Sequence, residues 1–181
     1  MSKIALFYGT TTGKTGDAAE AIQAELGGDD VVELKDISEC SAADLAEYDY
    51  LIIGCPTWNI GELQDDWAAI FDDLDGVDFT GKKVAYFGTG DQIGYCDNFQ
   101  DSMGMLEEKI SGKGGTTVGN WPKDDSYEGL MRSKAFLKND QGKPQKPRVF
   151  VGLALDEDNQ SDLTEGRIKT WVAQIKPEFG L

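Results

Sequence analysis

The chain alternates short apolar runs with segments of helical period, and this rhythm constrains the fold more than any other feature of the sequence. Strand-like runs lie at residues 3–9, 31–34, 50–54, 83–88 and 149–155, with a further candidate at 115–119. Between them, apolar residues recur at helical spacing in residues 17–26, 63–74, 99–110 and 163–175. Such alternation produces a parallel sheet with helices on both faces, joined by right-handed crossovers. The sequence therefore predicts a doubly wound α/β fold whose ligands bind beyond the carboxyl ends of the strands.

The length and the cysteines indicate the kind of protein to expect. The 181 residues are enough for one domain with a substantial core, and no apolar run approaches the length of a membrane span. The three cysteines, Cys40, Cys55 and Cys96, have no paired spacing and are interpreted as reduced thiols. An apolar run that begins at the third residue leaves no room for a signal peptide. We therefore expect a cytoplasmic protein, or one of the chloroplast stroma if the source is an alga.

Two features of the composition exclude classes of function. The chain has no histidine, so a Ser-His-Asp triad and a histidine-ligated zinc are impossible, and we expect no metal site. No cysteine or lysine is obviously poised as a nucleophile. The formal net charge of −16 argues against DNA or RNA as a partner and favours electrostatic steering toward basic surfaces.

Residues 121–148 break the rhythm of strands and helices. They contain three of the five prolines and no clear period, and their seven basic and four acidic residues give them a charge of +3 against −19 for the rest of the chain. We interpret them as an insertion in or beside the last strand rather than as a second domain. Residues 1–181 are accordingly expected to form a single domain.

The loop after the first strand has the composition of an anion site. Residues Thr10-Thr11-Thr12-Gly13-Lys14-Thr15 combine four hydroxyls with the exposed amides at the start of a helix. Hydroxyl and N–H groups donate hydrogen bonds, and the helix macrodipole also favours negative charge there. An ordinary turn with capping threonines is the simpler reading, but the density of donors favours a phosphate site.

Two other kinds of phosphate chemistry fit this loop less well. A nucleotide P-loop needs four residues between its first two glycines, whereas Gly9 and Gly13 enclose three, and no later strand ends in an acidic residue placed to hold magnesium. A phosphorylated-aspartate receiver shares the strand–helix rhythm, but the third strand ends in Gly54-Cys55-Pro56 and offers no acceptor carboxylate. A P-loop nucleotidase stays open as an alternative, and a receiver does not.

The loops after the third and fourth strands each carry an aromatic side chain. Trp58 lies in the loop 56–63, and Tyr95 lies in the glycine-rich loop 88–100. An aromatic face can stack on a planar ring, although a tryptophan at such an edge can also simply cover the core. The spacing Asp97-x-x-Gln100 resembles a capping box that opens the next helix. Together with the phosphate donors, the two aromatics indicate a pocket for a phosphorylated planar ring that acts as the redox agent.

Four stretches of the chain form a recognisable set of motifs. They are Phe7-Tyr8-Gly9-Thr10-Thr11-Thr12-Gly13-Lys14-Thr15, Gly54-Cys55-Pro56-Thr57-Trp58-Asn59-Ile60-Gly61-Glu62-Leu63, residues 87–101, and Gly152-Leu153-Ala154-Leu155-Asp156-Glu157-Asp158-Asn159-Gln160. Together they closely resemble the flavodoxins, specifically the long-chain type found in cyanobacteria and algae. The resemblance runs from end to end apart from much of residues 121–148.

The resemblance implies a fold, a cofactor and a set of binding residues. The fold would be a flavodoxin-like, five-stranded parallel sheet in the order 2-1-3-4-5, which binds FMN without covalent attachment. The loop from Thr10 to Thr15 would bind the phosphate through amides and hydroxyls, without a salt bridge from Lys14. Trp58 and Tyr95 would sandwich the isoalloxazine ring. The remaining predicted contacts, at the edges of the ring or along the ribityl chain, are Thr57, Asn59, Ile60, Thr89, Gly90, Asp91, Asn98 and Gln100, with Asp156 nearby.

The resemblance also implies a redox mechanism. One-electron reduction protonates flavin N5, which then becomes a hydrogen-bond donor. The peptide that joins Asn59 and Ile60 can turn its carbonyl to accept this hydrogen bond and stabilise the neutral semiquinone. Seven acidic residues and no basic one lie between Glu62 and Asp78. Two unit charges ~10 Å apart interact by about 1–2 kcal/mol at an effective dielectric constant of roughly 20. Such terms disfavour the anionic hydroquinone, so the protein is expected to cycle mainly between semiquinone and hydroquinone at low potential.

The function implied by the resemblance is that of a diffusible one-electron carrier, not an enzyme, that replaces or parallels ferredoxin. Its acidic face would dock on basic faces of partners such as ferredoxin–NADP reductase and photosystem I, and we expect a monomer that does not insert into membranes. The alternative is an FMN-dependent quinone or nitro reductase on the same fold. The basic insertion departs from the family pattern; we expect it to alter partner docking and not to bind flavin, while a tolerated surface loop is an equal alternative.

Overall fold

A computed structural model describes residues 4–128 and 131–181, so Lys3, placed in the predicted first strand, and residues 129–130 of the predicted insertion lie outside the described residues. The main sheet has the order β2-β1-β3-β5-β6, with β4 paired to β3 and β9 paired to β5. Its strands are β1 (Ile4–Tyr8), β2 (Val32–Asp36), β3 (Tyr50–Trp58), β4 (Glu62–Leu63), β5 (Lys83–Thr89), β6 (Thr116–Val118) and β9 (Leu153–Leu155). All pairs are parallel except β3 with β4. The predicted doubly wound α/β fold is confirmed.

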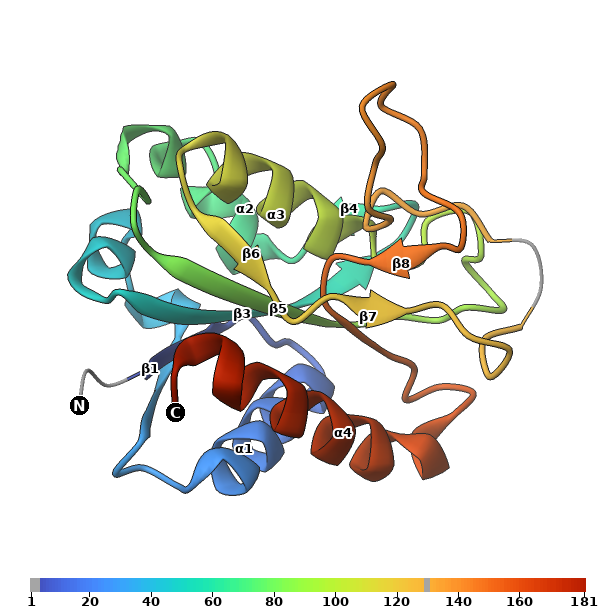
Figure 1. The fold of residues 1–181 in the computed structure, drawn as a ribbon, viewed down its shortest axis with the longest axis horizontal. Helices are drawn as coiled ribbons and strands as arrows, with labels where there is room; N and C mark the ends of the chain where they lie inside the picture. The colour runs from blue at the N-terminus through green and yellow to red at the C-terminus, as the bar shows by residue number, and fades with distance from the viewer. Residues whose placement is uncertain (1–3, 129–130) are drawn as a thin grey trace.

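The helices form a layer on each face of the sheet. Figure 1 shows α1 (Lys14–Leu26) and α4 (Ser161–Phe179) together on one face, with α2 (Asp65–Ile70) and α3 (Asp101–Gly112) on the other. Short 3-10 turns complete the elements: η1 (Ile37–Glu39), η2 (Ala42–Glu47) and η3 (Asp73–Gly76). The apolar stripe predicted on the third helix, from Phe99 to Ile110, is fully buried. Within the described part of the chain, no helix has both the length and the apolar character needed to cross a membrane.

The fifth position of the sheet is filled by two separate strands. β6 pairs with the first half of β5, through residues 83–85, and β9 pairs with the second half, through residues 87–89. The insertion therefore splits the last strand. The expected continuous strand at 149–155 is wrong, because β8 (Val149–Phe150) leaves the main sheet and pairs with β7 (Trp121–Pro122) instead. The chain returns to β5 at Gly152, where a Cβ would lie 2.1 Å from the carbonyl oxygen of Tyr86.

Two element boundaries differ from prediction for physical reasons. β3 does not end at Gly54 but continues to Trp58, because its last two residues pair antiparallel with β4. The helix predicted over 63–74 is only α2, which starts after Gln64, whose side chain accepts a hydrogen bond from Trp67 N–H. Acidic residues Asp72 and Asp73 follow α2, and negative charge at a helix C-terminus opposes the macrodipole. The chain continues as η3 instead.

The base of the insertion has an aromatic core of its own. The rings of Phe136 and Phe150 stack with centroids 4.8 Å apart, and Tyr127 meets Phe150 edge-on at 5.4 Å. The Tyr127 hydroxyl donates to the carbonyl oxygen of Ala154, at 2.5 Å, and accepts from Trp121 Nε1, at 2.8 Å. Because these contacts join the insertion to β9, its base is part of the folded body of the protein.

Candidate functional site

The carboxyl ends of β1, β3, β5 and β9 bring four loops around one cavity. The cavity has a volume of about 270 Å³. Eight of the predicted site residues line it: Thr12, Lys14, Thr57, Trp58, Thr89, Gly90, Asp91 and Tyr95. Pro56, Glu157 and Asp158 line it as well and were not predicted. The two acidic residues directly follow Asp156 in the sequence, so their position in the loop after β9 could have identified them as site residues.

The loop between β1 and α1 contributes Thr12 and Lys14 to the lining of this cavity and has unpaired amides. The helix starts at Lys14, three residues earlier than predicted, and Gly13 precedes it with a φ of 88°. The Thr10 hydroxyl accepts hydrogen bonds from the backbone N–H of Gly13, at 3.2 Å, and of Gly16, at 3.4 Å. Within the described chain no acceptor pairs with the backbone N–H groups of Thr11, Thr12, Lys14 and Thr15. A ligand with several acceptor oxygens fits such an arrangement.

Two buried contacts fix the position of this loop. The Thr15 and Thr89 hydroxyl oxygens are 2.9 Å apart, so the start of α1 is joined to the end of β5. Behind the loop, Trp67 Nε1 donates to the Gly54 carbonyl oxygen at 2.9 Å. Gly9 makes room for this packing, because a Cβ there would lie 2.3 Å from Gln64 Oε1 and 2.7 Å from Trp67 Cδ1. The amides are thus held in place before any ligand arrives.

The turn between β3 and β4 holds the predicted residues Asn59 and Ile60. Both side chains are exposed, Ile60 at 78%. Asn59 has a φ of 45° and Gly61 a φ of 81°, so the turn depends on two left-handed residues. Gly61 is required for a second reason, since a Cβ there would lie 2.6 Å from Asp101 Oδ2. In the part of the chain that is described, no donor pairs with the Asn59 carbonyl oxygen.

The loop between β5 and α3 (residues 90–100, the Tyr95 loop) carries Tyr95 with its side chain 48% exposed. Asn98 Nδ2 donates to Asp101 Oδ2 at 3.0 Å rather than to the cavity. The capping box suggested for Asp97 and Gln100 is wrong: Gln100 is itself the N-cap of α3, with a φ of 64°, and α3 starts at Asp101. Gln100 is fully buried, and its Oε1 has no hydrogen-bond partner while its Nε2 donates to the Leu155 carbonyl oxygen at 3.0 Å.

Asp156 lies beneath the site rather than in the lining of its cavity. Its carboxylate is fully buried and accepts hydrogen bonds from the backbone N–H groups of Gln92, Asp158 and Asn159 and from the side-chain amides of Gln92 and Asn159. The carboxylate therefore ties the loop after β9 to the Tyr95 loop.

The charged groups around the cavity are mainly acidic. Lys14 Nζ forms an ion pair with Asp158 Oδ1 at 2.7 Å, and this hydrogen bond raises the pKa of Lys14. Partial burial opposes ionisation of Asp91, but hydrogen bonds from Gly94 N–H, the Asn159 amide and Ile93 N–H outweigh it and lower the pKa of Asp91. Since Lys14 is committed to Asp158, the loop offers an anion neutral donors rather than a free cation.

These features fit a phosphorylated planar ring. Free amides and hydroxyls lie at the N-terminus of α1, two aromatic side chains line the adjacent cavity, and the buried Gln100 Oε1 is an acceptor without a donor. A buried acceptor of this kind is costly unless a partner is supplied. Among the described residues, no group of three or more acidic or cysteine side chains is placed to hold a metal ion.

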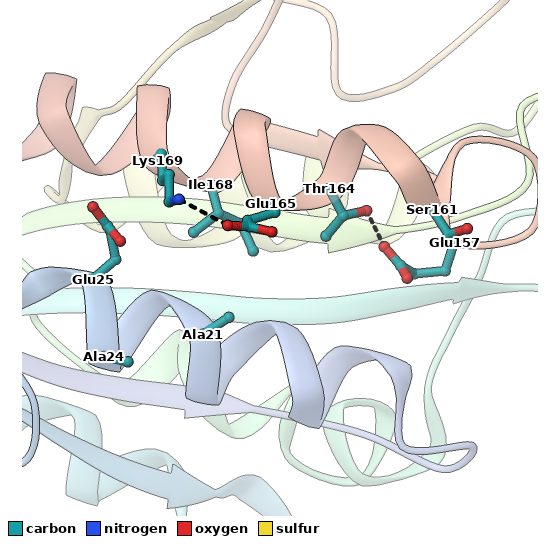
Figure 2. A pocket seen from close by; sticks show the side chains of 9 residues that line it. All are labelled: Ala21, Ala24, Glu25, Glu157, Ser161, Thr164, Glu165, Ile168 and Lys169. Atoms are coloured by element: carbon teal, nitrogen blue, oxygen red, sulfur yellow. Dashed lines mark hydrogen bonds and ion pairs between the residues drawn. The ribbon is translucent and has the colours of Figure 1, made fainter.

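A second hollow lies away from the strand ends, in the groove between α1 and α4. Figure 2 shows Ala21 and Ala24 of α1 facing Ile168 of α4, with acidic side chains along the rim. The Thr164 hydroxyl donates to Glu157, and Lys169 pairs with Glu165 at 2.7 Å. Because these rim groups are satisfied by one another, this groove shows no convergent set of free polar groups and is not the candidate site.

Comparison with known proteins gives one consistent result. The family model described as Flavodoxin matches residues 6–171. A flavodoxin of Synechococcus elongatus is 62% identical over 181 residues, covering 100% of both chains, and one of Nostoc sp. is 64% identical over 179 residues, covering 99% of this chain and 98% of the relative. A crystal structure of Fusobacterium nucleatum flavodoxin bound to flavin mononucleotide superposes with a TM-score of 0.85 at 30% identity, covering 98% of this chain and 99% of that one.

Proposed function

The chain belongs to the flavodoxin family, and from this premise we propose that it is a one-electron carrier that holds FMN without a covalent bond at the strand ends. The observation that carries the proposal is the cavity lined by Trp58 and Tyr95 next to the free amides of the Thr10–Thr15 loop. When bound, FMN supplies reversible one-electron chemistry that the side chains of this protein lack. The protein is an electron-transfer protein and not an enzyme.

The phosphate is proposed to bind the loop from Thr10 to Thr15. The unpaired N–H groups of Thr11, Thr12, Lys14 and Thr15 and the threonine hydroxyls are its donors, and Gly13 lets the backbone come close. Lys14 contributes its backbone N–H, while its ammonium stays paired with Asp158. Donation from neutral groups suits a site whose lining includes Asp91, Glu157 and Asp158.

The ring is proposed to lie between Trp58 and Tyr95, whose side chains both line the cavity. Offset stacking on an aromatic face contributes about 0.5–1.5 kcal/mol beyond burial of area. Gln100 is also proposed as a contact because its Oε1 is a buried acceptor without a partner, although the residue does not line the cavity. The other proposed contacts to the ring edge or the ribityl chain are Thr57, Asn59, Ile60, Thr89, Gly90, Asp91 and Asn98, whereas Asp156 acts indirectly by holding the Tyr95 loop.

The turn between β3 and β4 is proposed to control the proton at flavin N5. The Asn59 carbonyl oxygen has no donor within the described chain, and Gly61 in the left-handed region gives the turn a second backbone geometry at low cost. If this carbonyl turned toward the bound ring, its oxygen would accept a hydrogen bond from an N–H group at N5. Such a contact would stabilise the one-electron-reduced protein relative to the oxidised protein.

The acidic surroundings are proposed to set a low potential for the second electron. Asp91, Glu157 and Asp158 line the cavity, and only Lys14 among the lining residues is basic. Each full negative charge at ~10 Å opposes a further negative charge by about 1–2 kcal/mol. The carrier is therefore expected to use its second, lower-potential reduction step. In this role it would replace a ferredoxin or act in parallel with one.

The partners are redox proteins, and we propose that they present basic docking faces, as ferredoxin–NADP reductase and photosystem I are expected to do. A net charge of −16 supports steering toward such faces. We further propose that residues 1–181 form one domain, supported by a single cluster of buried apolar residues, and that this domain acts as a monomer. The three free cysteines support a reducing, cytoplasmic location.

Stepwise reduction tests this function. Anaerobic titration of the FMN-loaded protein with dithionite should pass through a one-electron-reduced species with long-wavelength absorbance, and the protein should not oxidise NAD(P)H by itself. Reduction in a single two-electron step, together with rapid NAD(P)H turnover, would contradict the carrier and support the reductase alternative, which the comparisons do not favour.

A further inference from the structure

The Tyr95 loop buries Phe99 and Gln100 at its end, but its middle, residues 91–98, is attached to the protein through one buried side chain. Between Asp91 and Asn98 only Gln92 is buried, at 2% exposure, while the other side chains are exposed or half-buried. A segment that carries a stacking aromatic but buries little apolar area depends on its polar contacts for a defined position. The contacts of Gln92, together with those of Asp91 and Cys96, therefore hold the segment that carries Tyr95.

Gln92 joins three segments that are distant in the sequence. Its Nε2 donates to Asp156 Oδ2 at 2.8 Å, and its backbone N–H donates to the same oxygen at 3.2 Å. Its Oε1 accepts the backbone N–H of Glu128 at 2.8 Å. The side chain thus connects the Tyr95 loop to the loop after β9 and to the base of the insertion, and both ends of its amide are used.

The base of the insertion holds the rest of the loop through two more backbone donors. Arg132 N–H donates to the Cys96 carbonyl oxygen at 3.1 Å, next to Tyr95, and Lys134 N–H donates to Asp101 Oδ1 at 2.8 Å. Gly104 of α3 permits this approach, because a Cβ there would lie 2.3 Å from the Lys134 carbonyl carbon. The insertion therefore contacts the loop near its start, at its middle and where α3 begins.

We propose that Gln92 is a positioning residue through which the base of the insertion holds Tyr95 against the flavin ring. The inference rests on the proposed function, since it assumes that Tyr95 stacks on FMN. It assigns a flavin role to a segment that contributes no residue to the lining of the cavity. The exposed tip of the insertion, residues 138–147, has no part in this role.

Replacing Gln92 by Leu tests the proposal. This change removes two hydrogen bonds: the Glu128 N–H loses its acceptor, and the Asp156 carboxylate loses one of its donors while keeping the others. We therefore expect FMN to bind about tenfold more weakly. Gln23→Leu is the matched control, because it removes a single hydrogen bond, to the Val32 carbonyl oxygen, far from the site. The FMN affinity of this control should stay within about twofold of the parent's. Denaturant unfolding of both apoproteins measures any loss of global stability.

A double-mutant cycle with Tyr95→Ala separates positioning from a merely structural role. If Gln92 acts by placing Tyr95, then Gln92→Leu should weaken FMN binding by less than about twofold in the Tyr95→Ala background. An equal loss in both backgrounds, or no loss in the parent, would overturn the proposal. If Tyr95→Ala itself leaves FMN affinity unchanged, Tyr95 does not stack on the ring. The proposed role of Gln92 is then refuted as well, because it assumes that stacking.

A conservative variant gives an independent readout. Gln92→Glu keeps the acceptor for Glu128 N–H but sets a carboxylate against Asp156, and two adjacent carboxylates share a proton as the pH falls. A protonated Glu side chain can donate to Asp156 as the amide does. We expect FMN affinity of this variant to recover between pH 7 and pH 5 relative to the parent, on the order of the loss at pH 7. A constant ratio across this range would count against the proposal.

Discussion

Trp58, at the end of β3, and Tyr95, in the Tyr95 loop, line the proposed flavin cavity from two different segments, so binding of the ring is expected to depend on each of them separately. Replacing either by Ala removes an aromatic wall, and we expect FMN affinity to fall by about 2 kcal/mol, or ~30-fold. Both reduction potentials should shift as well, because stacking differs in energy between the redox states. Fluorescence titration and potentiometry measure the two effects.

Tyr50→Ala is the matched control for these substitutions. Tyr50 is a half-buried aromatic at the other end of β3, where it packs on Phe179 with ring centroids 5.7 Å apart. This variant should lower stability but leave both potentials unchanged. Equal potential shifts in all three variants would mean that the effect is not one of stacking.

Ionisation of Asp91 is expected to make the stability of the Tyr95 loop depend on pH. The pKa of its carboxyl is lowered from 3.8 in the folded protein, so ionised Asp91 stabilises the loop above pH ~4, and this contribution is lost as the pH falls through the lower, folded value. All three hydrogen bonds go to Oδ1, which Asn also provides. Asp91→Asn should therefore release FMN less steeply below pH ~4 than the parent. Identical acid-release profiles, measured by flavin fluorescence, would refute this.

The sequence motifs pointed to several residues that the structure brings together around one cavity. Their contact with FMN stays a prediction, but Thr57, Trp58, Thr89 and Tyr95 all line the cavity. Asp156 and Gln100 do not, because each is buried beneath it and bonded to backbone from other elements. Pairings over 55 residues or more, such as Gln100 with Leu155, leave no local pattern to read.

The turn between β3 and β4 is the element whose geometry matters most for redox chemistry. Gly61→Ala places a Cβ at a φ of 81° and within 2.6 Å of Asp101 Oδ2. The unfavourable backbone angle and the clash with Asp101 both act on the turn that carries the Asn59 carbonyl. That carbonyl should then reach N5 less readily, so the first reduction potential should fall. We expect a smaller effect on FMN affinity, since the phosphate loop is untouched.

Gly76→Ala controls for the loss of a glycine. Gly76 closes η3, where a Cβ would meet no atom within 4 Å, and its φ is not in the left-handed region. Redox titration of the two variants compares them directly. If Gly61→Ala and Gly76→Ala have the same first reduction potential, the turn does not control uptake of the first electron.

Elements with strong apolar periodicity were the predictable ones. The apolar stripe from Phe99 to Ile110 predicted α3, and the run 83–88 predicted β5 nearly to the residue. The hairpin made by β3 and β4 was missed because Pro56 and the exposed turn look like loop, and only two residues of each strand pair. β8 was misplaced since its partner, β7, lies 27 residues earlier in the chain.

The whole molecule carries its charge unevenly. The exposed tip of the insertion, residues 138–147, projects from the body at the upper right in Figure 1. Its hydrogen bonds from Asn139 N–H to the Lys143 carbonyl oxygen, at 2.7 Å, and from Gln145 N–H to the Leu137 carbonyl oxygen, at 2.8 Å, give it a defined shape. We propose that this basic projection on an acidic carrier modulates docking, since residues 138–147 do not line the cavity.

Reversing the charge of this tip tests its role in docking. Lys143→Glu with Lys146→Glu takes the net charge from −16 to −20, since each reversal changes it by two units. Electron transfer to a basic reductase should then slow more steeply with added salt, while FMN affinity stays the same. The paired Lys→Arg substitutions keep the charge and should keep the parent's slope. Equal slopes for the reversed and parent proteins would show that the tip does not face the partner.

The central claim is that one cavity binds both the ring and the phosphate of FMN, and a comparison of two ligands tests it most directly. Fluorescence titration of the apoprotein should show one FMN bound per chain, and riboflavin, which lacks the phosphate, should bind on the order of 100-fold more weakly because the Thr10–Thr15 donors stay unpaired. Equal affinities for FMN and riboflavin, or no saturable binding of either, would contradict the account.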